Sequence, residues 1–112
     1  FSNLLFDGDD IVLLDFLDTY LDSPIQDIVK IRQDTKYYWS IRMLNCKFDR
    51  LKMIQCLNYI DEKIDYEFSK KKYYVKYYKI FQILNLLRIV PYCKEQTNVN
   101  YLINEVDKLC QH

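Results

Sequence analysis

SKKKYYVKYYKIFQILNLLRIVPY, residues 69–92, is the stretch that decides the fold. It has no glycine, and its one proline, Pro91, stands near the end, where it stops a helix. Apolar residues recur in it at helical spacing and form the expected inner stripe: Tyr73, Tyr77, Ile80, Leu84 and Leu87. Others extend the apolar surface round the helix: Tyr74, Phe81, Ile83 and Leu86. An all-round apolar helix is normally the central one of a bundle, so we predict a central helix from about Ser69 to Val90.

Start and stop signals divide the rest of the chain into further helices. Ser23, Pro24 and Gln26 form a capping box with proline at the first helical position, which predicts a helix from Pro24 to about Asn45. Asp49 is a natural N-cap for the next helix, which carries one apolar stripe and ends in a turn over residues 65–69. The members of this stripe are Leu51, Ile54, Leu57, Ile60 and Ile64.

The two ends of the chain also show helical periodicity. Thr97 or Asn98 caps a last helix, whose apolar positions are Val99, Leu102, Ile103, Val106, Leu109 and Cys110. Near the start, Asp9 or Asp10 is expected to cap a short helix with Ile11, Leu14, Leu17 and Leu21 on one face. We therefore predict an all-α fold of four to five helices. Residues 1–23 form an acidic N-terminal lead-in with a short helix, and residues 24–112 form a helical protein-interaction domain.

Composition supports this fold class. Half of the 112 residues are apolar, whereas glycine occurs once and proline twice, which leaves few residues for the tight turns of an all-β fold. The net charge is zero, which argues against nucleic acid as the main ligand. The charge is unevenly distributed, because no basic residue precedes Lys30 while residues 30–90 hold fourteen bases and six acids. We expect the acidic N-terminal segment to lie near, or compete for, this basic body.

Residues that carry chemistry are few. The cysteines Cys46, Cys56, Cys93 and Cys110 form no CxxC pair, and the only histidine is the terminal His112, so no zinc site is expected. No nucleophile has a predictable base beside it, and a single glycine cannot build a phosphate loop. We therefore expect no enzyme activity and no cofactor. No run of eighteen apolar residues predicts a membrane span. Four reduced thiols, mostly packed as small hydrophobes, are typical of an intracellular protein. Because the chain begins with Phe1 rather than Met, the missing targeting signal carries little weight.

The segment KFDRLKMIQCLNYIDEK, residues 47–63, resembles the integrase-binding domain of LEDGF, the lens-epithelium-derived growth factor coactivator. Its characteristic positions are occupied without a gap by Lys47, Phe48, Asp49, Leu51, Cys56, Leu57, Ile60, Asp61 and Glu62. The register continues to Arg88 and Ile89, and the resemblance covers about residues 37–110. The wider group includes the helical N-terminal domain of transcription factor IIS.

This resemblance implies a compact right-handed bundle in which two inter-helical loops form a small hydrophobic pocket. Phe48 and Ile89 would form the pocket, Asp49 would accept hydrogen bonds from the partner backbone, and Leu51 and Tyr92 belong to the same surface. The partners would be short linear motifs in disordered regions of transcription and chromatin proteins, which places the protein in the nucleus. For each residue a simpler interpretation stays open. Asp49 can be only an N-cap, and Phe48 and Ile89 can be ordinary core residues.

Two other functions remain open at this point. Surplus tyrosines and leucines on the second and fourth helices are also typical of a structural subunit in an obligate helical oligomer. A viral or parasite effector bundle that binds an amphipathic helix is a further alternative, although the usual Asn-Trp-Gly-Arg turn is missing. Of these, we favour a monomeric, non-enzymatic interaction module.

Overall fold

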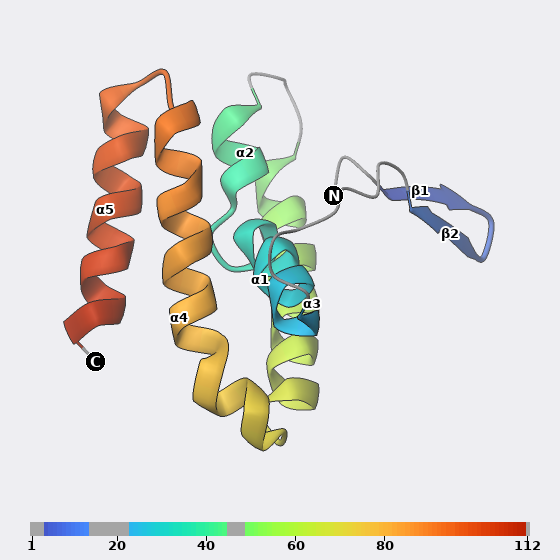
Figure 1. Ribbon diagram of the computed structural model, residues 1–112. Helices are drawn as coiled ribbons and strands as arrows, with labels where there is room; N and C mark the ends of the chain where they lie inside the picture. The colour runs from blue at the N-terminus through green and yellow to red at the C-terminus, as the bar shows by residue number, and fades with distance from the viewer. Residues whose placement is uncertain (1–3, 14–22, 45–48, 112) are drawn as a thin grey trace.

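The computed structural model describes residues 4–13, 23–44 and 49–111 and shows a helical bundle with a small N-terminal hairpin (Figure 1). The prediction of an all-α fold of four to five helices is confirmed: five packed helices are present. The helices are α1 (Pro24–Thr35), α2 (Trp39–Met43), α3 (Arg50–Phe68), α4 (Lys72–Ile89) and α5 (Gln96–Gln111), with a 3₁₀ turn, η1 (Val90–Tyr92), between the last two. The hairpin consists of the strands β1 (Leu4–Asp7) and β2 (Asp10–Leu13).

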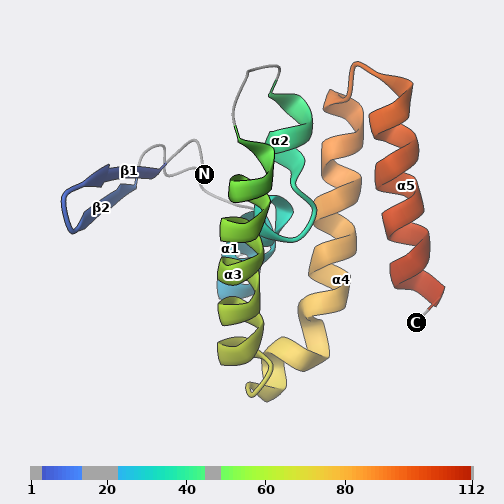
Figure 2. The same cartoon turned by 180° about the vertical axis from the view of Figure 1, so that it is seen from behind.

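Helix α1 is the centre of the bundle. It packs against α2, α3 and α4, and α5 covers the far side of α4 (Figures 1 and 2). Its buried residues cover most of the helix and leave one side, with Pro24, Asp27 and Ile31, exposed. The buried residues are Ile25, Gln26, Ile28, Val29, Arg32, Asp34 and Thr35. The prediction that α4 is central is therefore wrong. The shorter α1 has neighbours on three sides, whereas α4 lies mainly between α1 and α5.

The buried face of α4 also differs from the prediction. The residues that α4 buries are Tyr74, Gln82, Asn85, Leu86 and Ile89. The predicted inner stripe lies on the opposite side of the helix, and its five residues are between 41 and 56 % exposed. Because α4 is apolar all round, periodicity alone could not identify the face that packs.

The predicted helix from Pro24 to Asn45 is interrupted after Thr35. Tyr38 adopts a left-handed conformation with φ of 54°, which ends the run of helical dihedrals before α2 begins at Trp39. The carboxylate of Asp34 accepts a hydrogen bond of 2.8 Å from the backbone N–H of Ser40 and so holds the new helix start. The end of the predicted helix, at Asn45, lies outside the described residues.

The other helix limits lie close to their predicted places. The side chain of Asp49 accepts a hydrogen bond from the backbone N–H of Lys52, which confirms Asp49 as the N-cap of α3. That helix continues through the predicted turn to Phe68. After α4, Pro91 lies within η1, and α5 begins one residue before the predicted cap Thr97.

The N-terminal segment contains strands where the sequence predicted a helix. Residues 10–13 pair with residues 4–7 in an antiparallel hairpin, so the short helix starting at Asp9 or Asp10 is wrong over this range. Gly8, with φ of 61°, opens the two-residue loop, a position that favours glycine. The rest of the predicted helix, with Leu14, Leu17 and Leu21, lies outside the described residues. In both views the hairpin projects from the bundle (Figures 1 and 2), and a contact between the acidic segment and the basic body stays a prediction.

Two apolar clusters form the core. The first joins α1 to α4 through Ile25, Ile28, Val29 and Tyr74, with Ile64 and Phe68 of α3 packed against it. The second joins α4 to α5 and to the link before α2; its buried members are Tyr37, Leu86, Ile89, Leu102 and Val106. Near it, the Arg42 guanidinium lies 3.8 Å from the ring centroid of Tyr101, which holds α2 against α5.

The buried guanidinium of Arg32 joins the three helices of the first cluster, α1, α3 and α4. Arg32 of α1 donates two hydrogen bonds of 2.9 Å to the carboxylate of Asp61 on α3. Its Nη1 also donates to Asp65 at 3.1 Å and to the phenol of Tyr74 on α4 at 2.9 Å. Thr35 donates a hydrogen bond of 2.7 Å to the same Asp61 carboxylate. The charge of Arg32 is thus matched inside the bundle, and it fixes α1, α3 and α4 relative to one another.

We predict that Arg32→Met strongly destabilises the fold. Removing the guanidinium leaves Asp61 partly buried without its counter-charge, a change that costs about 3–5 kcal/mol in such pairs. Urea unfolding followed by circular dichroism measures the difference. The matched control is Arg50→Met at the exposed start of α3, for which we expect a change within about 0.5 kcal/mol. A loss below about 1 kcal/mol for Arg32→Met would contradict the role assigned to this network.

We also predict that stability falls at alkaline pH. Burial raises the pKa of Tyr37, Tyr74 and Tyr78 above the ordinary value of 10.0, although Arg32 opposes the rise at each of them. Above pH 10 the unfolded chain therefore releases protons that the folded chain still holds. Each such group lowers the free energy of unfolding by up to about 1.4 kcal/mol per pH unit.

The variant Tyr78→Phe removes one of these groups and should make the alkaline fall in stability less steep. Urea unfolding at a series of pH values between 8 and 11.5 measures the slope. The control, Tyr59→Phe, removes a solvent-exposed phenol. If Tyr78→Phe loses stability with pH as steeply as the unmodified protein, the Tyr78 phenol is not buried as described.

Candidate functional site

The predicted loop residues lie at one end of the bundle in different environments. Asp49 caps α3 and keeps its side chain more than half exposed. Leu51 and Tyr92 are 68 and 82 % exposed. Ile89 is instead buried and packs in the second core cluster with Leu86 and Leu102. Phe48 lies outside the described residues.

These residues do not converge on one cavity in the described structure. The start of α3 and the end of α4 are at the same end of the bundle, and α2 lies between them (Figures 1 and 2). Because the side chain of Ile89 is buried and packs in the core, it cannot also line an open pocket. The simpler interpretations of Asp49 as an N-cap and Ile89 as a core residue therefore describe what these two side chains do in the fold.

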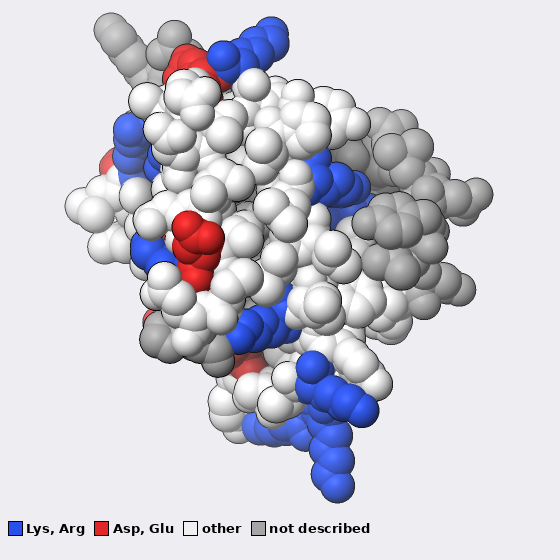
Figure 3. All heavy atoms as spheres, turned by 60° about the vertical axis from the view of Figure 1, so that its left-hand side comes forward, with Lys and Arg blue, Asp and Glu red and all other residues white. Residues whose placement is uncertain are grey.

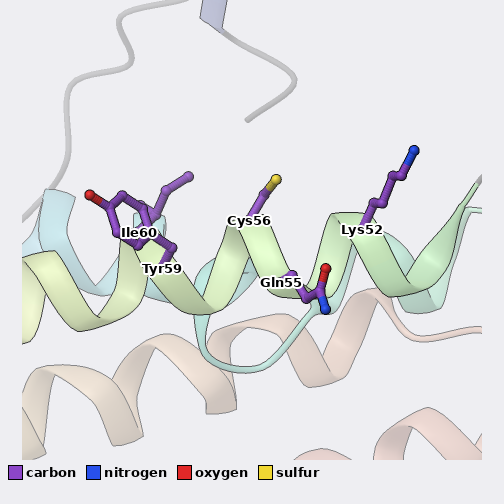
Figure 4. A pocket seen from close by; sticks show the side chains of 5 residues that line it. All are labelled: Lys52, Gln55, Cys56, Tyr59 and Ile60. Atoms are coloured by element: carbon purple, nitrogen blue, oxygen red, sulfur yellow. The ribbon is translucent and has the colours of Figure 1, made fainter.

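A pocket of about 520 Å³ lies on the outer face of α3. It is lined by Lys52, Gln55, Cys56, Tyr59 and Ile60, all projecting from one side of one helix (Figure 4). Among the residues that the structure describes, only this helix lines the depression, so they supply no enclosing walls or convergent polar groups of the kind typical of small-molecule sites.

A smaller pocket of about 230 Å³ lies between α3 and the link that follows α1. Its lining includes Thr35, Lys36, Asn58, Asp61 and Glu62. Burial lowers the pKa of Lys36, and the positive charge of Arg32 lowers it further. The Asp61 carboxylate already accepts hydrogen bonds from Arg32 and Thr35, so its oxygens are engaged in holding the fold.

Metal-binding and membrane-spanning features are not found in residues 4–13, 23–44 and 49–111. Within these ranges no cluster of histidine, cysteine and acidic side chains could hold a metal ion, and no helix is long and apolar enough to cross a bilayer. The described cysteines Cys56, Cys93 and Cys110 are free thiols. Cys56 and Cys110 are exposed, so the prediction that most cysteines are packed is wrong for both. Partial burial raises the pKa of the Cys93 thiol.

An exposed apolar stripe runs along the outward face of α4 and is here called the α4 stripe. It consists of Tyr73, Tyr77, Ile80, Leu84 and Leu87, all exposed and spaced at alternating intervals of four and three residues. This spacing keeps side chains on one narrow face of a helix. Sequence reasoning found these residues but assigned them to the core. The polar Gln82 and Asn85 lie on the face that α4 buries, so the residue types on the two faces provided no signal that the apolar stripe is the exposed face.

Basic side chains border the α4 stripe. By helical geometry, Lys72, Lys76 and Lys79 follow one edge of it and Arg88 lies on the other. The Lys76 ammonium lies 5.0 Å from the ring centroid of Tyr77, so its stem runs beside the stripe. On the face of the molecule that includes α5, uncharged residues cover most of the middle, with an acidic side chain among them. The largest group of Lys and Arg lies at its lower end (Figure 3), the end where α3 turns into α4.

Comparisons with models of known protein families, with curated proteins and with solved structures gave no significant match to this chain.

The two roles considered for Asp49 can be separated by mutation. Asp49→Ala removes the N-cap and should lower the free energy of unfolding by about 1 kcal/mol, whereas Asp49→Asn keeps a capping oxygen and should change it little. Chemical unfolding of the two variants measures both values. If Asp49→Ala costs nothing, the carboxylate is not needed at the start of α3. Because Asp49→Asn keeps the shape of the side chain and removes its charge, this variant isolates any contribution of the charge to partner binding.

Proposed function

We propose that this chain is a non-enzymatic protein-interaction module that docks a short helical segment of a partner on the α4 stripe. The observation that carries the proposal is the run of five exposed apolar side chains on one face of α4. Contiguous apolar surface of this kind is unfavourable in water and is typical of binding sites. Its alternating spacing is the one by which a helix contacts another helix.

The chemistry of the stripe suits recognition of a flexible partner. Leu84 and Leu87 offer apolar contact, while the tyrosines add ring surface with a hydroxyl at the edge. A disordered segment that folds on such a surface needs apolar anchors to offset its ordering entropy. The resemblance of residues 37–110 to the integrase-binding domain of LEDGF-type coactivators supplies a partner class, namely disordered regions of nuclear transcription and chromatin proteins. Asp49, Leu51 and Tyr92 remain proposed contacts at the end of the bundle.

A structural subunit of an obligate oligomer is the second candidate, because the same stripe would suit a coiled-coil contact. The charges of α4 count against pairing with another copy. Between Lys72 and Ile89 the helix has four basic residues and no acidic one. A second copy of α4 would therefore offer no carboxylate to the basic residues that border the stripe, so a homotypic seam would gain no ion pairs along its edges.

The test compares the proteins retained from an extract of the producing cells by the full chain and three exposed variants. Leu84→Glu disrupts the α4 stripe, Val75→Glu alters an exposed position elsewhere on α4, and Leu51→Glu alters the loop end of α3. Circular dichroism confirms that each variant is folded. Loss of an anchor costs about 2 kcal/mol of binding free energy, which is about thirtyfold in affinity. We therefore expect some proteins to bind Leu84→Glu about thirtyfold more weakly than the unmodified chain and to bind Val75→Glu as well as the unmodified chain.

Two results would count against the proposal. If all variants retain the same proteins, the α4 stripe is not a docking site. If partners are lost with Leu51→Glu and kept with Leu84→Glu, docking occurs at the loop end instead.

A further inference from the structure

From the charges that border the α4 stripe we infer the chemistry of its occupant: an amphipathic helix whose polar edges are acidic. This inference rests on the proposed function and specifies the partner of that same surface. It follows from two independent features of α4, the spacing of its exposed apolar residues and the single sign of its charges.

The spacing sets the shape of the occupant. Tyr73 to Leu87 spans fifteen residues, or four turns, and extends about 21 Å along the helix axis. A partner helix that matches it needs about fifteen residues with apolar side chains at the same alternating intervals. A peptide of that length is barely helical alone, so it would fold as it binds.

The charges set the sign of its edges. Lys72, Lys76 and Lys79 follow one border of the stripe, and Lys70 and Lys71 extend the basic run beyond the helix start. Within the described residues, none of these lysines forms an ion pair with a carboxylate. Acidic residues flanking the apolar face of a docked helix would lie beside these ammonium groups and favour its approach.

Other occupants match the surface less well. A second copy brings a helix with no acid, as argued above. Nucleic acid would satisfy the lysines, but its phosphates offer nothing to Ile80, Leu84 and Leu87 in the centre of the stripe. An anionic membrane offers acyl chains as well as phosphates, but the alternating four- and three-residue spacing of a narrow stripe is that of a contact with another helix. An acidic amphipathic helix satisfies both the apolar centre and the basic border.

The experiment measures binding of fluorescently labelled synthetic peptides to the full chain by fluorescence anisotropy. The acidic probe has about fifteen residues, with leucines at the intervals of the α4 stripe and glutamate or alanine elsewhere. One control peptide has lysine in place of each glutamate. Another keeps the acidic composition but redistributes the leucines round the helix. We expect the acidic probe to bind at least about tenfold more tightly than either control, with an affinity that falls as salt is added.

Variants of the protein then assign this binding to the surface. Leu84→Glu should abolish binding of the acidic probe, and Val75→Glu should leave it unchanged. The double variant with Lys76→Glu and Lys79→Glu should reverse the preference toward the lysine peptide. All four substitutions alter exposed positions, and each of the three variants is checked for the helix content of the unmodified chain.

The outcomes separate this inference from the proposed function. If the acidic and lysine peptides bind equally and both are lost with Leu84→Glu, the α4 stripe still stands as a docking site. The inference of an acidic partner is then overturned. Self-association in light scattering that Leu84→Glu abolishes would overturn it in favour of a second copy. Binding of duplex DNA or of phosphatidylserine vesicles that depends on Leu84 would overturn it in favour of those ligands. If no peptide binds, the inferred chemistry is wrong even where the extract experiment identifies a partner.

Discussion

The guanidinium of Arg32 lies inside the bundle, and its hydrogen bonds define how α1, α3 and α4 pack. Its partners are Asp61 and Asp65 of α3 and the Tyr74 phenol of α4, so a single side chain of α1 addresses both neighbouring helices. A charge in this position is tolerated only when carboxylate and hydroxyl groups surround it. This requirement specifies the register of α1 against α3 and α4 more strictly than interchangeable apolar contacts can.

The position of α1 has a direct consequence for α4. With α1 on one side and α5 on the other, α4 buries the face that carries Tyr74, Asn85 and Leu86. Its opposite face has no neighbour among the described elements and presents the α4 stripe to solvent. The candidate site thus follows from the packing of the centre of the bundle, since a fold built round α4 would have buried this same stripe.

Sequence reasoning predicted the parts of this fold that depend on local signals. The capping residues Ser23 and Asp49 both mark helix starts in the structure, and five helices are present. Features that depend on tertiary contacts were missed. The break at Tyr38 needs the Asp34 carboxylate to cap the next helix, and the hairpin at Gly8 overrides a helical pattern. For the site, the sequence identified the exposed Leu51 and Tyr92 but could not show that Ile89 belongs to the core.

The composition of the two faces of α4 bears on why its outward face is apolar. Buried positions include Gln82 and Asn85, and in the described structure the Gln82 Nε2 has no hydrogen-bond partner, which is costly in a core. Leucine and isoleucine meanwhile occupy exposed positions. Stability of the isolated chain alone would favour the reverse arrangement. Conflicts between sequence pattern and fold are expected at functional sites, because selection there acts on binding as well as on folding. This arrangement is the one expected if, as we propose, a partner helix covers the outward face of α4.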